Sequence, residues 1–135
     1  MYLEIDPNSF SIKTTDVGKG GSGKVYEGEL ILINKKKKTK KIAVKKIINE
    51  DPQLLRREIV LLSMLSSPYI IDFLGSCRIK EGDELICHLV TNFADNGNLF
   101  DLFGKWEIDP EFKINVLLDV SKGIQYLHSK NVVHR

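Results

Sequence analysis

The sequence predicts an α+β fold in which strand-like segments come first and helices follow. Two apolar runs, residues 25–33 and 42–48, flank a polar stretch and so predict a β-hairpin. Two Asp-Pro pairs, Asp51-Pro52 and Asp109-Pro110, each precede a segment whose apolar residues recur at helical spacing. The 135 residues are enough for about one domain with a core of its own.

The net positive charge of the chain comes from the predicted hairpin. Residues 25–33 alternate and then become wholly apolar, as in a partly buried strand. We expect the lysine-rich stretch that follows, at 35–41, to form the solvated tip. The net charge is +2, and without the six lysines of this stretch it would be −4, so it does not indicate a nucleic-acid-binding face. A role on an anionic surface is the less favoured interpretation of these lysines.

A helix is predicted to follow the hairpin. Asp51 suits the N-cap and Pro52 the first helical position, while Ser66-Ser67-Pro68 ends the helix. One predicted face consists of Leu54, Glu58, Leu61 and Leu65, with Leu55, Ile59 and Leu62 beside it. Residues 70–79 and 85–91 then predict two further strands joined by a turn at 80–83. The first half therefore has the order strand, strand, strand, helix, strand, strand.

The second half is predicted to be helical. Asn98 caps a short helix that runs through Phe103 and stops at Gly104. Asp109-Pro110 opens a longer helix with Gly123 inside it, and glycine there costs about 1 kcal/mol relative to alanine, so we expect a close neighbour at Gly123. The apolar face of the longer helix consists of Ile114, Leu117, Val120 or Ser121, Ile124 and Leu127.

The composition excludes several classes of protein. Cys77 and Cys87 are too few for a disulfide framework and lack metal-site spacing, so we expect free thiols in a reducing compartment. The first ten residues carry two acids and no apolar core, which argues against a signal peptide. No apolar run approaches the ~18 residues that a membrane span needs. An intracellular soluble domain is therefore expected.

The segment from Gly18 to Val25 is compatible with three phosphate-binding templates. It matches seven of the eight P-loop positions, but Val25 replaces the Ser or Thr that holds Mg²⁺. The P-loop and the dinucleotide fingerprint both require a helix next, whereas residues 25–33 predict a strand. The third template, G-x-G-x-x-G-x-V between two strands, fits the glycine-rich loop of protein kinases. A ligand-free glycine turn is equally consistent with this segment taken alone.

Two charged residues on otherwise apolar segments form a second indication. Lys45 lies within an apolar strand, and Glu58 lies on the apolar side of the helix that follows. Lys45 alone could snorkel to water. A carboxylate on an apolar face is costly to bury unless it is paired, and Lys45 can supply that pair. We therefore predict a Lys45–Glu58 ion pair facing the glycine segment.

In order and spacing these motifs resemble the N-terminal part of a eukaryotic protein kinase, from about Phe10 to Arg135. Segments 42–45 and 68–75 resemble the strand lysine motif and the entry to the fourth strand, and 89–94 resembles the gatekeeper and hinge. Segment 97–99 resembles the G-S-L segment that follows the hinge. Segment 126–129 resembles the end of helix αE, and 132–135 resembles the start of the H-R-D loop. The tyrosine-kinase-like serine/threonine group is favoured. Minor departures are Ser22, Asn92 and Asn98.

The resemblance implies a two-lobed α+β fold whose smaller lobe is a five-stranded antiparallel sheet with helix αC. It places the N-lobe at about 10–91, the hinge at 92–97 and the start of the C-lobe at 98–135. It implies transfer of the ATP γ-phosphate to protein Ser or Thr hydroxyls in the cytoplasm, with no nucleic-acid or membrane partner. The resemblance implies that Lys45 contacts the α- and β-phosphates and that Glu58 holds Lys45 in place. The residues expected to hold ATP are Gly18, Lys19, Gly20, Gly21, Ser22, Gly23, Lys24 and Val25 over the phosphates, and Ala43, Thr91, Phe93 and Ala94 around adenine.

The sequence as given reaches His134-Arg135, the first two residues of the catalytic loop. In this family the Asp that orients the substrate hydroxyl and the ligands of Mg²⁺ come after these two residues. We therefore expect the 135 residues alone to be inactive, and the protein substrate to contact the C-lobe beyond them. The alternatives are a nucleotide-binding or scaffolding module without chemistry, resembling a pseudokinase, and less favourably a P-loop NTPase.

Overall fold

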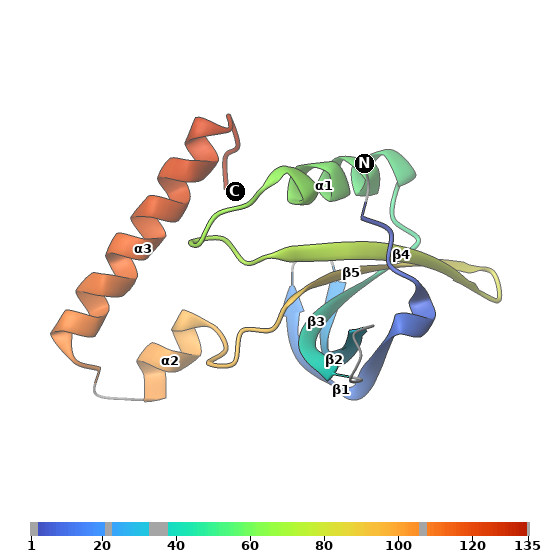
Figure 1. Cartoon of the computed structure of the whole chain (residues 1–135), viewed down its shortest axis with the longest axis horizontal. Helices are drawn as coiled ribbons and strands as arrows, with labels where there is room; N and C mark the ends of the chain where they lie inside the picture. The colour runs from blue at the N-terminus through green and yellow to red at the C-terminus, as the bar shows by residue number, and fades with distance from the viewer. Residues whose placement is uncertain (1–2, 21–22, 33–37, 106–107, 135) are drawn as a thin grey trace. The chain divides into compact units, whose positions relative to one another are not determined.

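The structure of the chain, a computed structural model, describes residues 3–20, 23–32, 38–105 and 108–134 (Figure 1). The chain divides into two compact units. The first consists of Met1–Met64 and Asp72–Phe93, and the second of Leu65–Ile71 and Ala94–Arg135. The sheet lies in the first unit, and the two C-terminal helices lie in the second.

The first unit contains a five-stranded sheet whose ladders are all antiparallel, in the order β1-β2-β3-β5-β4. The strands are β1 (Phe10–Gly20), β2 (Gly23–Leu32), β3 (Lys38–Ile48), β4 (Phe73–Glu81) and β5 (Glu84–Asn92). This confirms the α+β class, the β2–β3 hairpin and the five-stranded sheet that the sequence and the family resemblance predicted. It also excludes the P-loop alternative, because a strand follows Gly23.

Two strand boundaries differ from the prediction. The lysines at 38, 40 and 41 do not form a free tip, because β3 begins at Lys38 and pairs these positions with β2. Cross-strand backbone pairing overrides the preference of charged side chains for loops. Residues 35–37 lie outside the described residues. The fourth strand begins at Phe73 rather than at residue 70, and Ile70 and Ile71 belong to the second unit.

The sheet has an apolar cluster on each face, because successive residues of a strand point to opposite sides. On one face the buried residues are Phe10, Ile42, Val44, Cys77 and Val90. On the other face Ile47, Cys87 and Leu89 pack against Leu55 and Ile59 of the helix. Both cysteines are free, as expected, and the structure shows that both are buried. Burial raises the pKa of the Cys77 thiol to about 11.

The helix after the hairpin, α1 (Pro52–Met64), begins as predicted. The Asp51 carboxylate accepts hydrogen bonds from the backbone N–H groups of Gln53 and Leu54, at 2.7 and 3.2 Å. The predicted buried face is wrong by one position. Leu55 and Ile59 are buried, whereas Leu54 and Leu61 are exposed. Glu58 lies at the edge of the packed face, one residue before Ile59.

The N-terminal segment pairs with the edge strand β4, which was not predicted. Glu4 forms a parallel bridge with Ser76, the Ile5 N–H donates to the Ser76 carbonyl, and the Ser76 N–H donates to the Leu3 carbonyl. A short 3-10 turn at Pro7–Ser9 then leads into β1. Gly75 makes this pairing possible. Its φ is 145°, and a Cβ built on it would lie 2.5 Å from the Leu3 carbonyl oxygen.

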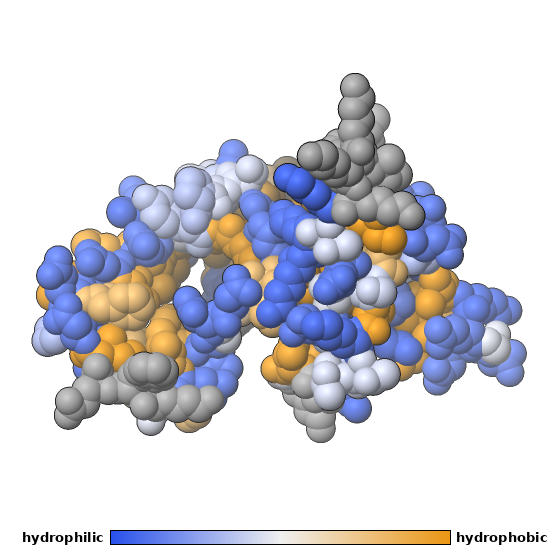
Figure 2. Space-filling model, turned by 60° about the horizontal axis from the view of Figure 1, so that its bottom comes forward, coloured by the Kyte–Doolittle hydropathy of each residue, from blue (hydrophilic) through white to orange (hydrophobic). Residues whose placement is uncertain are grey.

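The second unit contains α2 (Leu99–Lys105) and α3 (Pro110–Ser129). Asn98 and Asp109 cap them as predicted, although α2 extends one residue past the expected stop at Gly104. The close neighbour expected at Gly123 is the backbone of Tyr69, whose carbonyl oxygen would lie 3.1 Å from an added Cβ. Figure 2 shows apolar side chains at the surface of this part of the chain. The exposed members of the predicted α3 face are Ile114, Leu117, Val120 and Ile124.

A substitution at Gly75 tests the docking of the N-terminal segment. Gly75→Ala should lower the free energy of unfolding by about 2 kcal/mol, because the new Cβ meets the Leu3 backbone and the φ of 145° strains alanine. Gly82→Ala is the matched control. Its φ is 60°, but an added Cβ there has open space, so about 1 kcal/mol is expected. Urea unfolding followed by circular dichroism measures both, and equal losses would contradict the docking.

His88 makes the stability of the sheet pH-dependent. Burial, and next the charge of Lys46 on the neighbouring strand, lower the pKa of His88 below 6.5. The unfolded state therefore binds more protons than the folded state once the pH falls below about 6.5. The free energy of unfolding should accordingly decrease from pH 7.5 to 5.5. This pH slope should shrink in His88→Asn and persist in His128→Asn, whose imidazole is exposed; thermal melts at both pH values measure it.

Candidate functional site

The glycine-rich segment connects β1 and β2. Gly18 pairs with Val25 and Gly20 with Gly23, while residues 21 and 22 lie outside the described part. A Cβ at Gly23 would lie 2.5 Å from the carbonyl oxygen of Lys46, so β3 itself requires glycine there. A Cβ at Gly18 would meet nothing within 4 Å. Packing thus explains Gly23 but not Gly18, and Gly18 is the stronger candidate for a role towards a ligand.

Lys45 lies beside the end of this segment. In the register of the sheet it pairs with Val25 of β2 and Leu89 of β5. Directly paired residues point to the same face, and Leu89 belongs to the cluster that packs on α1. The Lys45 side chain therefore points to the face covered by α1. There its Nζ donates to Oε1 of Glu58 at 3.0 Å, which confirms the predicted ion pair.

The Lys45–Glu58 pair is partly open to solvent. The side chain of Lys45 is 25% exposed and that of Glu58 is 37% exposed. Since water screens the pair, its own contribution to stability is small. Glu58 directs the ammonium group of Lys45 along the face of the sheet instead of leaving it free to turn into solvent. The pair therefore positions a cation next to the glycine-rich segment.

The four residues expected around adenine are divided between the two units. Ala43 pairs with both Glu27 and Thr91, so these three side chains share the Lys45 face of the sheet. The Thr91 hydroxyl donates to the Asn92 carbonyl at 3.1 Å. Phe93 is the last residue of the first unit, and Ala94 begins the second segment of the second unit. The structure thus groups Ala43, Thr91 and Lys45 on one face, whereas the roles of all four remain predictions.

Sequence reasoning missed two charged residues on this face. Lys41, assigned to a solvated tip, lies over the ring of Phe93, with its Nζ 3.9 Å from the ring centroid. The same Nζ is 3.6 Å from Oε1 of Glu27. Glu27 also accepts a hydrogen bond from Lys13, which holds the pKa of the carboxyl below its usual value. Lys41, Ala43 and Lys45 occupy alternate positions of the strand. This spacing could have indicated from the sequence that Lys41 shares a face with Lys45.

Other parts of the predicted site are less informative. His134 is exposed, and Arg135 lies outside the described residues. Within the described ranges no three His, Cys, Asp or Glu side chains come close enough to bind a metal ion. None of the described helices is long and apolar enough to cross a bilayer.

A double-mutant cycle tests the energetics of the ion pair. Lys45→Met, Glu58→Gln and the double variant should give a coupling of about 0.5 kcal/mol in urea unfolding, because both side chains are partly exposed. The exposed Lys122–Asp119 pair, at 3.4 Å, is the matched control and should couple more weakly. A Lys45–Glu58 coupling near zero would contradict a stabilising interaction between the two side chains.

Comparison with known proteins agrees with this geometry. A probable serine/threonine-protein kinase of Dictyostelium discoideum is 31% identical over 136 residues, which cover 97% of this chain and 21% of that protein. A G-type lectin S-receptor-like serine/threonine-protein kinase of Arabidopsis thaliana is 34% identical, with 98% of this chain and 16% of that protein covered. The serine/threonine-protein kinase TNNI3K of Mus musculus is 28% identical, with 96% and 16% covered. The chain thus spans about a fifth or less of the length of these relatives.

The family model described as protein tyrosine and serine/threonine kinase matches residues 12–135, nearly the whole chain. The five-stranded sheet, its helix and the Lys45–Glu58 pair are the arrangement that the kinase resemblance implied. The chain therefore belongs to the protein tyrosine and serine/threonine kinase family.

Proposed function

We propose that these residues form the ATP-binding part of a protein kinase that phosphorylates Ser or Thr hydroxyls. The observation that carries the proposal is the Lys45–Glu58 ion pair, which holds a cation beside the glycine-rich hairpin. A scaffold that binds no nucleotide needs neither charge at these two positions. Serine/threonine specificity is supported by the names of the relatives, all three of which are serine/threonine kinases.

The proposed roles come from the family resemblance, and the placement of the described residues supports them. Backbone N–H groups of the glycine-rich hairpin, from Gly18 to Val25, cover the phosphates. Lys45 contacts the α- and β-phosphates, and Glu58 keeps its ammonium group pointed at them. Ala43 leaves room for the adenine ring because its side chain is small, and Thr91 lies opposite it in the register. Phe93 and Ala94 supply the hinge side of the adenine site.

We also propose that the two compact units correspond to the two lobes of the family. The N-lobe covers about 10–91, the hinge 92–97, and the beginning of the C-lobe 98–135. The boundary after Phe93 falls within the proposed hinge, which supports this division, whereas Leu65–Ile71 lies within the proposed N-lobe and yet belongs to the second unit. The exposed apolar face of α3 is then a surface that other C-lobe helices cover. Two free thiols are consistent with a cytoplasmic kinase, and the tyrosine-kinase-like group remains the favoured one.

A polypeptide limited to these 135 residues should bind ATP without transferring phosphate. Phosphoryl transfer depends on positioning the substrate hydroxyl and on neutralising charge with Mg²⁺. The described residues offer no metal cluster, and the family's catalytic Asp follows His134-Arg135 in the motif. We assign nucleotide binding to residues 18–25, Lys45 and Glu58, and expect phosphoryl transfer to require further residues.

Equilibrium dialysis with radiolabelled ATP tests the proposal. Lys45→Met should weaken binding about tenfold, since a charge-assisted hydrogen bond to phosphate is worth 1.5 kcal/mol or more. Lys46→Met is the matched control: it removes the same charge from the next residue of β3, whose side chain points to the opposite face. Equal binding by both variants, or no binding by the parent chain, would favour the scaffolding alternative. Lys45-dependent transfer of label to a peptide would contradict the expected inactivity.

A further inference from the structure

Lys41 and Glu27 carry charges on the same face of the sheet as Lys45, but they lie towards the other end of β3. Lys41 is two residues before Ala43 and four before Lys45, and strand residues at even spacing share a face. Glu27 is the β2 partner of Ala43 in the register. These two charged side chains therefore lie beside the residue that we propose to face adenine, and not beside the phosphate end of the site.

The end of β5 brings Phe93 to Lys41. The ladder between β3 and β5 ends where Ile42 pairs with Asn92. One further step of the same register sets Phe93 opposite Lys41, so that both side chains lie on one face. The Nζ atom of Lys41 lies 3.9 Å from the centroid of the Phe93 ring, which is the geometry of a cation–π contact.

Glu27 holds the same ammonium group. Its Oε1 atom lies 3.6 Å from Nζ of Lys41 and also accepts a hydrogen bond from Lys13 of β1. This hydrogen bond holds the pKa of the Glu27 carboxyl below its usual value, so the carboxylate is ionised at neutral pH. A continuous set of contacts thus leads from β1 through β2 and β3 to the Phe93 ring. The Lys41 side chain is 44% exposed, so these contacts orient groups more than they stabilise the fold.

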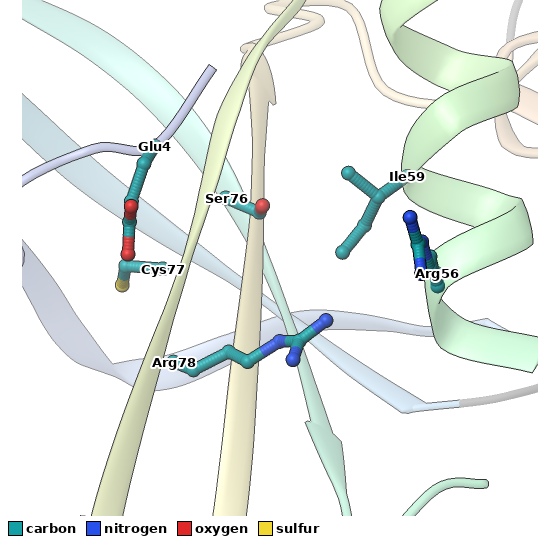
Figure 3. Close-up of a pocket in the computed structure, with 6 residues that line it drawn as sticks. All are labelled: Glu4, Arg56, Ile59, Ser76, Cys77 and Arg78. Atoms are coloured by element: carbon teal, nitrogen blue, oxygen red, sulfur yellow. The ribbon is translucent and has the colours of Figure 1, made fainter. Parts of the chain in front are cut away.

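The hollow of the first unit lies at a different part of the sheet. It has a volume of about 340 Å³ and lies between the N-terminal segment, β4 and α1 (Figure 3). Its wall residue Arg78 pairs with Cys87, which in turn pairs with Ile47, six residues along β3 from Lys41. The contact between Lys41 and Phe93 is therefore separate from that hollow and belongs to the proposed adenine end of the nucleotide site.

We propose that Lys41 is a positioning residue for the adenine ring of ATP and acts through Phe93. The inference rests on the proposed nucleotide site. The cation–π contact holds the Phe93 ring at the start of β3, and this fixes the backbone beside the ring where the hinge meets adenine. Without the contact, the ring has further rotamers, and ATP binding must select one of them at a cost in side-chain entropy. Lys41 itself contacts neither the base nor the phosphates.

Equilibrium dialysis of the whole chain with radiolabelled ATP tests this inference. Inorganic tripolyphosphate is the competing ligand, because it carries phosphates without adenine. Lys41→Met should weaken ATP binding about threefold, the loss expected from one partly exposed cation–π contact, and should leave the inhibition constant of tripolyphosphate unchanged. Lys45→Met should weaken binding of both ligands. Lys40→Met is the matched control, because it removes the same charge from the opposite face of β3 and should bind ATP like the parent chain.

Two further variants separate positioning from a general effect of charge. Lys41→Arg keeps a cation over the ring and should bind ATP like the parent chain. In Phe93→Leu, which has no ring, adding Lys41→Met should cause no further loss of ATP binding. If Lys41→Met fails to fold, Lys41→Gln is measured in its place.

The outcomes distinguish this inference from the proposed function. A parent chain that binds ATP no better than Lys41→Met would overturn the role of Lys41 alone. Equal weakening of tripolyphosphate binding, or a further loss when Lys41→Met is added to Phe93→Leu, would also overturn it and would leave the nucleotide site in place. A parent chain that binds no ATP would overturn the proposed function and this inference together.

Discussion

The register of β3 between β2 and β5 is the constraint on which the rest of the first unit depends. It sets Lys45 between Val25 and Leu89, and Ala43 between Glu27 and Thr91. Because a strand alternates its side chains, a shift of one residue would send Lys45 to the face of Val44 and Ile42. An unpaired ammonium group among those buried residues would be costly. The apolar residues of β3 thus fix the position of its one functional cation.

Short-range signals predicted the beginnings of the helices, whereas long-range packing decided which faces are buried. Asp51, Asn98 and Asp109 cap their helices through hydrogen bonds that span only two or three residues, so sequence alone locates them. The prediction of the buried side of α1 was wrong because two apolar stripes lie next to each other on this helix, one with Leu54 and Leu61 and the other with Leu55 and Ile59. Either stripe could pack, and the choice of Leu55 and Ile59 depends on contacts with Ile47, Cys87 and Leu89 of distant strands.

The candidate site could be predicted from the sequence only where a charged residue lies on an otherwise apolar segment. A carboxylate beside an apolar helical stripe indicated that Glu58 has a partner, and the nearest strand cation was Lys45. Lys41 could not be identified in this way, because it is one of six neighbouring lysines and nothing in the sequence indicates that it lies over Phe93. The pairing of residues 3–5 with β4 was not predictable either, because it joins positions some seventy residues apart and leaves no periodic pattern in the sequence.

Gly18 and Gly23 belong to the same motif, but the structure requires glycine at only one of these two positions. Gly23 is required by the fold, because the carbonyl of Lys46 occupies the space of a Cβ, and a structure with no ligand would keep glycine there. Gly18 has open space around it and no positive φ that would exclude other residues. The glycine pattern is therefore partly a consequence of strand packing, so a match to it indicates a phosphate site only weakly. Lys45 and Glu58 support nucleotide binding more strongly, because the packing of the sheet does not require their charges.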